Sequence, residues 1–156
     1  MKKKEPSDIK IVAKNKKALH EHHIEEKVEA GIQLMGSEVK SLRDGRGALS
    51  DSYAIIKEGE LWLIGAHIAQ YPPASFLNHE PKRTRKLLLH RREITKLWTK
   101  LRQKGYTLVP LALYFRRGRA KVELGLARGK RKYDKRVAIR EREMKRELSR
   151  SVRKNR

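Results

Sequence analysis

The sequence contains no cysteine among its 156 residues. Disulfides and thiolate metal sites are therefore excluded, which fits a reducing compartment. Long apolar runs are missing too, because no segment approaches the roughly 18 residues that a membrane-spanning helix needs. The N-terminal segment is basic, but no apolar stretch follows it as a signal peptide would require. We therefore expect a soluble, cytoplasmic protein that does not enter a membrane.

Acidic residues are scarce relative to basic ones. Lys and Arg number 40 and Asp and Glu only 18, which gives a formal net charge of +22. So large an excess repels itself in a compact state unless a polyanion binds. The charge favours nucleic acid as the partner, ahead of an acidic membrane surface. It does not by itself separate a ribosomal from a chromatin-like role.

Apolar residues make up 38% of the chain, enough for one modest core. Two hairpins stand out, because β-prone runs flank short glycine-containing turns. The first joins residues 53–56 to 61–64, and the second joins 106–115 to the alternating run from Val122 to Leu126. Alternation from Ile24 to Leu34 predicts a further strand.

Shorter elements complete the prediction. Residues 9–13 are expected to form a strand, 15–22 a short helix or turn, and 38–43 a helical turn. Apolar residues at helical spacing from Leu87 to Leu101 predict one long helix, which Gly105 would end. Five or six short strands with few helices favour a mainly β fold. We predict a small closed antiparallel OB-type barrel with peripheral helices and a basic C-terminal tail.

We divide the chain into three parts: a flexible N-terminal arm at residues 1–8, a barrel domain at 9–130 and a basic tail at 131–156. From Arg128 onward the composition becomes rich in Lys and Arg and poor in apolar residues. Such a segment cannot bury enough area to offset its ordering entropy. We expect the tail to be disordered when free and helical on a partner; a permanently disordered, solubilising tail is the alternative.

No motif for catalysis or metal binding is complete. In the cluster His20, Glu21, His22 and His23, Ile24 stands where the zincin motif needs its second histidine. The run from Gly125 to Arg131 is one residue too short for a P-loop and lacks its hydroxyl. We therefore expect no enzyme activity, no metal and no cofactor. The roles of the three histidines remain open.

Five blocks of sequence follow one another in the order known from one bacterial family. They are Glu-Ala-Gly at 29–31, Gly-Ser-Glu-Val-Lys-Ser-Leu-Arg at 36–43, Asp-Ser-Tyr at 51–53, Arg-Thr-Arg-Lys-Leu-Leu-Leu-His at 83–90 and Tyr-Asp-Lys-Arg at 133–136. With these blocks the chain resembles the small protein B family, the SsrA-binding proteins, from Asn15 to about Glu143. The resemblance implies an OB-type barrel and a monomeric adaptor. Such an adaptor binds the tRNA-like part of transfer-messenger RNA and brings it to stalled ribosomes for trans-translation, that is, ribosome rescue and peptide tagging.

The resemblance also implies which residues act. The RNA-binding candidates that match family positions are Asn15, Glu29, Leu88 and Lys121. Basic candidates for phosphate contact are Arg83, Arg85, Lys86 and Lys130. The tail residues implied to work on the RNA of the small ribosomal subunit are Tyr133, Asp134, Lys135 and Arg136.

Physical readings of these residues stay partly open. Lys121 can contact phosphate, and the ring of Tyr133 can stack on a base. Glu29 could accept from a base amino group or orient an arginine, or it could form a surface ion pair. Without the resemblance, Leu88 would be assigned to the core of the long helix, and residues 83–86 to its solvated start. The alternative function is a structural ribosomal protein, which would remain on the subunit through a salt wash.

Overall fold

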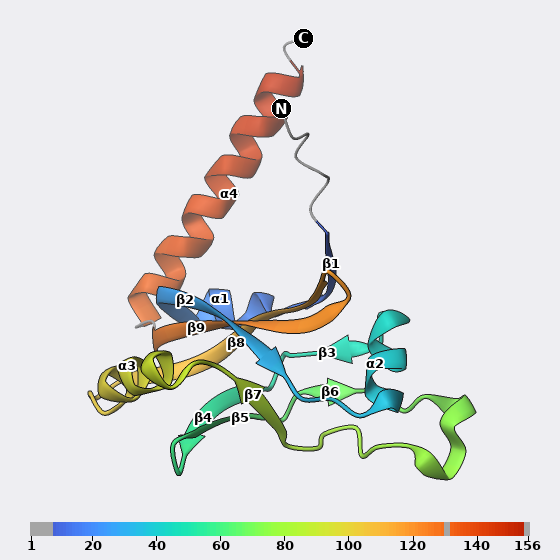
Figure 1. Cartoon of the computed structure of the whole chain (residues 1–156). Helices are drawn as coiled ribbons and strands as arrows, with labels where there is room; N and C mark the ends of the chain where they lie inside the picture. Colours follow the sequence, from blue (N-terminus) through green and yellow to red (C-terminus); the bar gives the residue numbers. More distant parts are fainter. Residues whose placement is uncertain (1–7, 130–131, 155–156) are drawn as a thin grey trace, which may run out of the picture.

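The computed structural model describes residues 8–129 and 132–154, shown in Figure 1. The described residues form nine strands, four α-helices and one 3-10 helix. In chain order they are β1 (Ile9–Lys14), α1 (Lys16–Glu21), β2 (His22–Ile32), α2 (Gly36–Arg43), β3 (Gly47–Ala48), β4 (Tyr53–Lys57), β5 (Glu60–Ile64), β6 (His67–Ile68), η1 (Pro72–Leu77), β7 (Arg85–Leu88), α3 (Arg91–Leu101), β8 (Tyr106–Arg116), β9 (Arg119–Gly129) and α4 (Lys132–Lys154).

Seven of the strands form one antiparallel sheet in the order β1-β8-β4-β5-β7-β2-β9, and β9 pairs in addition with β8. A separate two-stranded sheet consists of β3 and β6. Figure 1 shows the helices at the periphery of the strands, with α4 extending away from them. The protein is therefore mainly β with peripheral helices, as the sequence predicts.

Both predicted hairpins are confirmed. The β4–β5 turn has positive φ at Glu58 (54°) and Gly59 (74°), and the β8–β9 turn at Arg117 (51°) and Gly118 (77°). Left-handed geometry at both central residues is typical of type I′ turns, whose twist matches that of the flanking strands. Glycine at the second central position allows this conformation without strain. These turns fix the registers of the strands on which the candidate site is built.

The core lies on the inward positions of the strands. Ala30 on β2, Leu61 on β5, Leu108 on β8 and Leu124 on β9 are completely buried. Successive side chains point to opposite faces, so Glu29 and Gly31 on β2, and Glu123 and Gly125 on β9, lie on the outer face. Leu97 anchors α3 against this core.

The predicted start of the long helix is wrong. Leu87 and Leu88 belong to β7, which lies between β5 and β2, and α3 begins at Arg91. Leu87 pairs with Leu61 and is buried, whereas Ile94 lies on α3. The helical spacing between Leu87 and Ile94 is therefore coincidental, because the two residues belong to separate elements. The strand predicted to reach Leu34 also ends earlier, at Ile32.

The short elements near the N-terminus follow the prediction. β1 corresponds to the strand expected at 9–13, α1 to the short helix at 15–22 and α2 to the helical turn at 38–43. The predictions missed β3, β6 and η1, which lie in the connections around β4 and β5. None of these elements exceeds six residues, so they carry little periodicity.

Beyond the sheet, residues 132–154 form the single helix α4. Arg142 Nη2 on α4 lies 2.7 Å from His20 Nδ1 on α1. Ile139, Met144 and Leu148 are exposed on α4. The expectation that this segment folds only on a partner stays a prediction. Within the described ranges, no helix is both long and apolar enough to cross a membrane.

Candidate nucleic-acid interface

Four strands bring three of the predicted site residues to one face of the sheet. Gly31 on β2 pairs with Leu88 on β7 and with Lys121 on β9, and Lys121 pairs with Tyr114 on β8. Directly paired residues point to the same face. Leu88, Gly31, Lys121 and Tyr114 therefore form a line across the outer face, which we call the cross-strand row. Glu29 lies two residues from Gly31 on β2, so it shares this face.

Gly31 allows the strands of the row to pack closely. A Cβ atom at position 31 would lie 3.2 Å from the Cβ atom of Leu88. That separation is tighter than ordinary van der Waals contact, so a larger residue would displace Leu88. The side chain of Leu88 is 48% exposed, and the position therefore offers an apolar contact beside the cation of Lys121.

Glu29 is held as a carboxylate by its neighbours. Its Oε2 accepts a hydrogen bond from the Tyr114 hydroxyl, and Arg116 Nη1 approaches the same oxygen at 3.3 Å. The hydrogen bond from Tyr114 is the largest influence and lowers the pKa of Glu29 below its ordinary value; Arg116 and Lys121 lower it further, while burial opposes them. The interface thus contains a fixed negative charge, in a geometry that orients Arg116.

Tyr114 responds in the opposite sense. Burial raises the pKa of its phenol above the ordinary value, and the Glu29 carboxylate adds to that rise. The phenol therefore stays protonated and remains a donor to Glu29. Its fixed position on β8 ties the outer face of β2 to β8, across β9.

Asn15 does not belong to the exposed face. It is 3% exposed, and its Nδ2 donates to the carbonyl oxygens of Leu49 at 3.1 Å and Pro110 at 2.9 Å. Its Oδ1 accepts from the backbone N–H of Ala18 at 3.1 Å and so caps α1. These bonds connect three parts of the chain: helix α1, the segment that precedes β4, and strand β8. The structure therefore places Asn15 as a support of the fold beneath the surface.

Arg85 is completely buried on β7. Its Nε donates to Glu38 Oε2, and its two terminal nitrogens donate to the carbonyl oxygens of Ala66 at 2.8 Å and Pro81 at 3.0 Å. A buried guanidinium is tolerated only when it is paired and hydrogen-bonded in this way. In this conformation the side chain of Arg85 has no surface from which to contact RNA.

Arg83 and Lys86 are partly exposed and already paired with acids. Arg83 Nη2 donates to Glu38 Oε1, and Lys86 Nζ lies 3.1 Å from Glu60 Oε1. Burial raises the pKa of Glu38, but hydrogen bonds from Arg83, the Met35 N–H and Arg85 outweigh it and hold the pKa below the usual value. Lys86 lies two residues before Leu88, so it extends the basic face along β7.

The remaining predicted residues lie at the start of the tail. Lys130 falls outside the described residues. Tyr133, Asp134, Lys135 and Arg136 occupy the first turns of α4, and the side chain of Arg136 is exposed. The ribosome-contacting candidates therefore belong to a different element from the cross-strand row.

The histidines do not assemble a metal site in the described part of the chain, where no group of three His, Asp or Glu residues could hold an ion. His22 Nδ1 lies 3.2 Å from the Ala18 carbonyl, where α1 ends. No motif in the sequence pointed to His79, which is buried between Ser37 Oγ and the Ile68 carbonyl, each at 2.8 Å.

Sequence reasoning missed Tyr114 and Arg116. Both lie in or beside an apolar run that indicates only a buried strand. A signal was present in the hairpin: a two-residue turn at 117–118 pairs Arg116 with Arg119 and therefore Tyr114 with Lys121. Counting outward from the turn would have placed Tyr114 beside the predicted cation.

These features define a small, strongly basic, mainly β protein whose outer sheet face combines a cation, an exposed leucine and an oriented carboxylate. The model of the SmpB protein family matches residues 12–154. An SsrA-binding protein of Acidothermus cellulolyticus is 60% identical over 146 residues, which cover 94% of this chain and 92% of the relative. One of Thermobifida fusca is 58% identical over 147 residues, with 94% and 92% covered.

A solved structure described as "tmRNA-SmpB: a journey to the center of the bacterial ribosome" is similar in fold. Its matching chain is 50% identical and superposes with a TM-score of 0.65, covering 81% of this chain and 93% of that one. The chain belongs to the SmpB family.

Proposed function

We propose that this protein is a non-enzymatic adaptor that binds the tRNA-like part of transfer-messenger RNA and brings it to stalled ribosomes for trans-translation. The observation that carries the proposal is the convergence of Glu29, Leu88 and Lys121 on one face. The names of the relatives support transfer-messenger RNA as the first partner, and the similar solved structure supports the ribosome as the second.

Binding would combine three different contacts. Lys121 supplies a cation for phosphate, which positions the RNA without reading its sequence. Leu88 presents an exposed apolar side chain to a ribose or base. Glu29, held ionised, orients Arg116 or accepts from a base amino group. None of these groups has to make or break a covalent bond.

The fold that carries this face is, in our proposal, a closed OB-type barrel. The support is the circular sequence of pairings β8-β4-β5-β7-β2-β9, in which β9 pairs again with β8. Closure would leave β1 as an additional strand on β8 and would hold the cross-strand row rigidly. We also propose that the protein is cytoplasmic and monomeric when free.

The tail would act on the ribosome through the first turns of α4. Exposed apolar residues at Ile139, Met144 and Leu148 support a helix that completes its packing on a partner. Amide exchange of the free protein would test this: fast exchange throughout 132–154 is expected, and slow exchange there would contradict it.

Competition binding tests the RNA specificity. At a fixed and stated salt concentration, a tRNA-like RNA should displace labelled transfer-messenger RNA at lower concentration than a duplex of equal length. The face combines apolar and directional contacts, which a regular duplex backbone does not satisfy. Equal displacement by both RNAs would overturn the proposal.

A further inference from the structure

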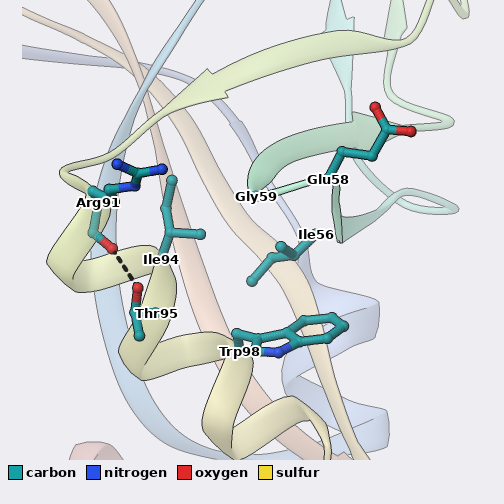
Figure 2. A pocket seen from close by; sticks show the side chains of 7 residues that line it. All are labelled: Ile56, Glu58, Gly59, Arg91, Ile94, Thr95 and Trp98. Atoms are coloured by element: carbon teal, nitrogen blue, oxygen red, sulfur yellow. Dashed lines mark hydrogen bonds between the residues drawn. The ribbon is translucent and has the colours of Figure 1, made fainter.

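A hollow separates the β4–β5 turn from helix α3, away from the cross-strand row. Its volume is about 290 Å³, and Figure 2 shows the side chains that line it. Ile56 contributes from β4, whereas Ile94 and Trp98 contribute from one face of α3. Trp98 remains 46% exposed although it is a large aromatic. The hollow is therefore an apolar surface that the fold leaves open.

A cation stands at the rim. Arg91 lies one turn of α3 before Ile94, and in Figure 2 its guanidinium lies above Ile94, at the opposite end of the lining from Trp98. The guanidinium of Arg91 makes no hydrogen bond or ion pair with any residue that the structure describes, in contrast to those of Arg83 and Arg85. The carboxylate of Glu58 at the opposite rim points away from the indole in the same view. The hollow thus combines an aromatic ring with an unneutralised positive charge.

Both walls of the hollow belong to regular secondary structure. The type I′ turn at Glu58 and Gly59 fixes one side, and buried Leu97 anchors α3 on the other. A preformed site loses little entropy when a ligand enters.

A second hollow lies next to this site. It lies on the other side of the same turn, shares Glu58 with the first, and contains Trp62. Trp62 pairs directly with Lys86, two residues before Leu88 of the cross-strand row. The two tryptophans of the chain therefore line two hollows, one on each side of the β4–β5 turn.

We propose that the hollow between α3 and the β4–β5 turn binds an unpaired nucleotide of RNA, with its base stacked against Trp98 and its phosphate contacted by Arg91. A base offers a flat π surface on which an exposed indole can stack, and the phosphate supplies the negative counter-charge that the Arg91 guanidinium lacks. Of the charged side chains that line the hollow, Arg91 is a base and Glu58 an acid. Helix α3 as a whole is positively charged, since it carries four basic residues and one acid: Arg91, Arg92, Lys96, Lys100 and Glu93. This charge favours RNA over an apolar peptide segment as the occupant. The inference rests on the proposed function only in that RNA is the ligand.

Tryptophan fluorescence tests the stacking directly. In a Trp62→Phe background Trp98 is the one remaining indole. Full-length protein would be titrated with an oligoadenylate of about eight nucleotides, within the usual range for single-strand sites, and separately with heparin, a polyanion without bases. We expect strong quenching by the oligonucleotide and little by heparin. No quenching by the oligonucleotide, or equal quenching by both, would overturn the site.

Paired variants separate stacking from general attraction. Trp98→Leu should weaken oligoadenylate binding roughly 5- to 150-fold, the range that corresponds to one stacked base, and Trp98→Tyr should restore most of it. Arg91→Ala should weaken binding more than Arg92→Ala, although both remove one charge. Equal effects of the two arginine changes would contradict a defined phosphate contact.

Binding of intact transfer-messenger RNA distinguishes the two proposals. If the Trp62→Phe protein binds that RNA through Lys121 but shows no quenching, the hollow is excluded as a nucleotide site and the proposed function stands. If it binds oligoadenylate at Trp98 but not transfer-messenger RNA, the hollow stands and the proposed function fails.

Discussion

The phenol of Tyr114 on β8 donates a hydrogen bond to the Glu29 carboxylate on β2, across the strand β9 that lies between them. This bond keeps Glu29 ionised and fixed beside Lys121. Tyr114→Phe should therefore destabilise the protein by about 1.5–3 kcal/mol at pH 7, the usual value for a hydrogen bond to a charged group. Urea unfolding would measure the loss. Tyr53→Phe, which deletes an exposed hydroxyl, is the matched control and should change little.

The same pair predicts how stability depends on pH. The pKa of Glu29 is lowered in the folded state, so its contribution is present above the ordinary pKa of about 4.3 and is lost as the pH falls through the folded value. The difference between wild type and Tyr114→Phe should therefore shrink in acid. The pKa of Tyr114 is raised, so its contribution is complete below the ordinary pKa of about 10 and is lost as the pH rises through the raised folded value. A difference that stays constant from acid to alkali would refute this coupling.

Asn15 offers a test of indirect action. Asn15→Ala removes the cap of α1 and the Nδ2 donor to the carbonyls of Leu49 and Pro110, although Ser52 still donates to Leu49. We expect a loss of about 2–4 kcal/mol in stability. Under conditions in which the variant is fully folded, its RNA affinity should match that of the wild type. Asn15→Ser, which keeps an acceptor for the cap, should lie between the two in stability. A folded Asn15→Ala variant that fails to bind RNA would instead indicate a direct contact.

The buried Glu38–Arg85 pair should matter more than any surface pair. Glu38→Gln leaves the buried guanidinium of Arg85 without a counter-charge, so we expect a cost of about 3–5 kcal/mol. Glu60→Gln breaks only the exposed pair with Lys86 and should cost at most about 1 kcal/mol. Thermal unfolding of both variants checks the contrast. Similar losses of stability in the two variants would contradict a buried, charge-dependent Glu38–Arg85 pair.

Replacing Lys121 should change how the RNA affinity depends on salt concentration. If about five phosphates are contacted, the logarithm of affinity should fall with the logarithm of salt at a slope of roughly −3.5 to −4.5. Lys121→Ala should make that slope shallower by about 0.7–0.9, because each phosphate contact releases counterions and this variant makes one contact fewer. Lys121→Arg keeps the charge and should keep the slope. An unchanged slope in Lys121→Ala would show that this cation does not touch phosphate.

The parts of the fold that the sequence predicts are those with local signals. The hairpins were found because Gly59 and Gly118 mark their turns between alternating runs. β7 was missed because it has only four residues and gains its identity from pairing with β2 and β5. No local pattern distinguishes it from the start of a helix.

The site shows the same division. Lys121 and Glu29 lie on strands in which apolar and polar residues alternate, so their outward position follows from the sequence. Arg85 was expected to contact RNA, yet it is buried because Glu38, 47 residues earlier in the chain, neutralises it. Leu88 is exposed because β7 ends beside Gly31, which no spacing within 83–90 indicates. Partners far apart in sequence decide both cases.

The central claim is that the sheet face holds the RNA whereas the tail acts only on the ribosome. The most direct test compares transfer-messenger RNA binding with peptide tagging on stalled ribosomes in the variant Asp134→Ala, Lys135→Ala and Arg136→Ala. The triple change removes one acid and two bases, a net loss of one positive charge from +22, so general attraction to RNA should hardly change. We predict near-normal binding and failed tagging, whereas the Glu29→Ala and Lys121→Ala double variant should lose binding first. If the tail variant lost RNA binding as severely as the double variant, the claim would be contradicted.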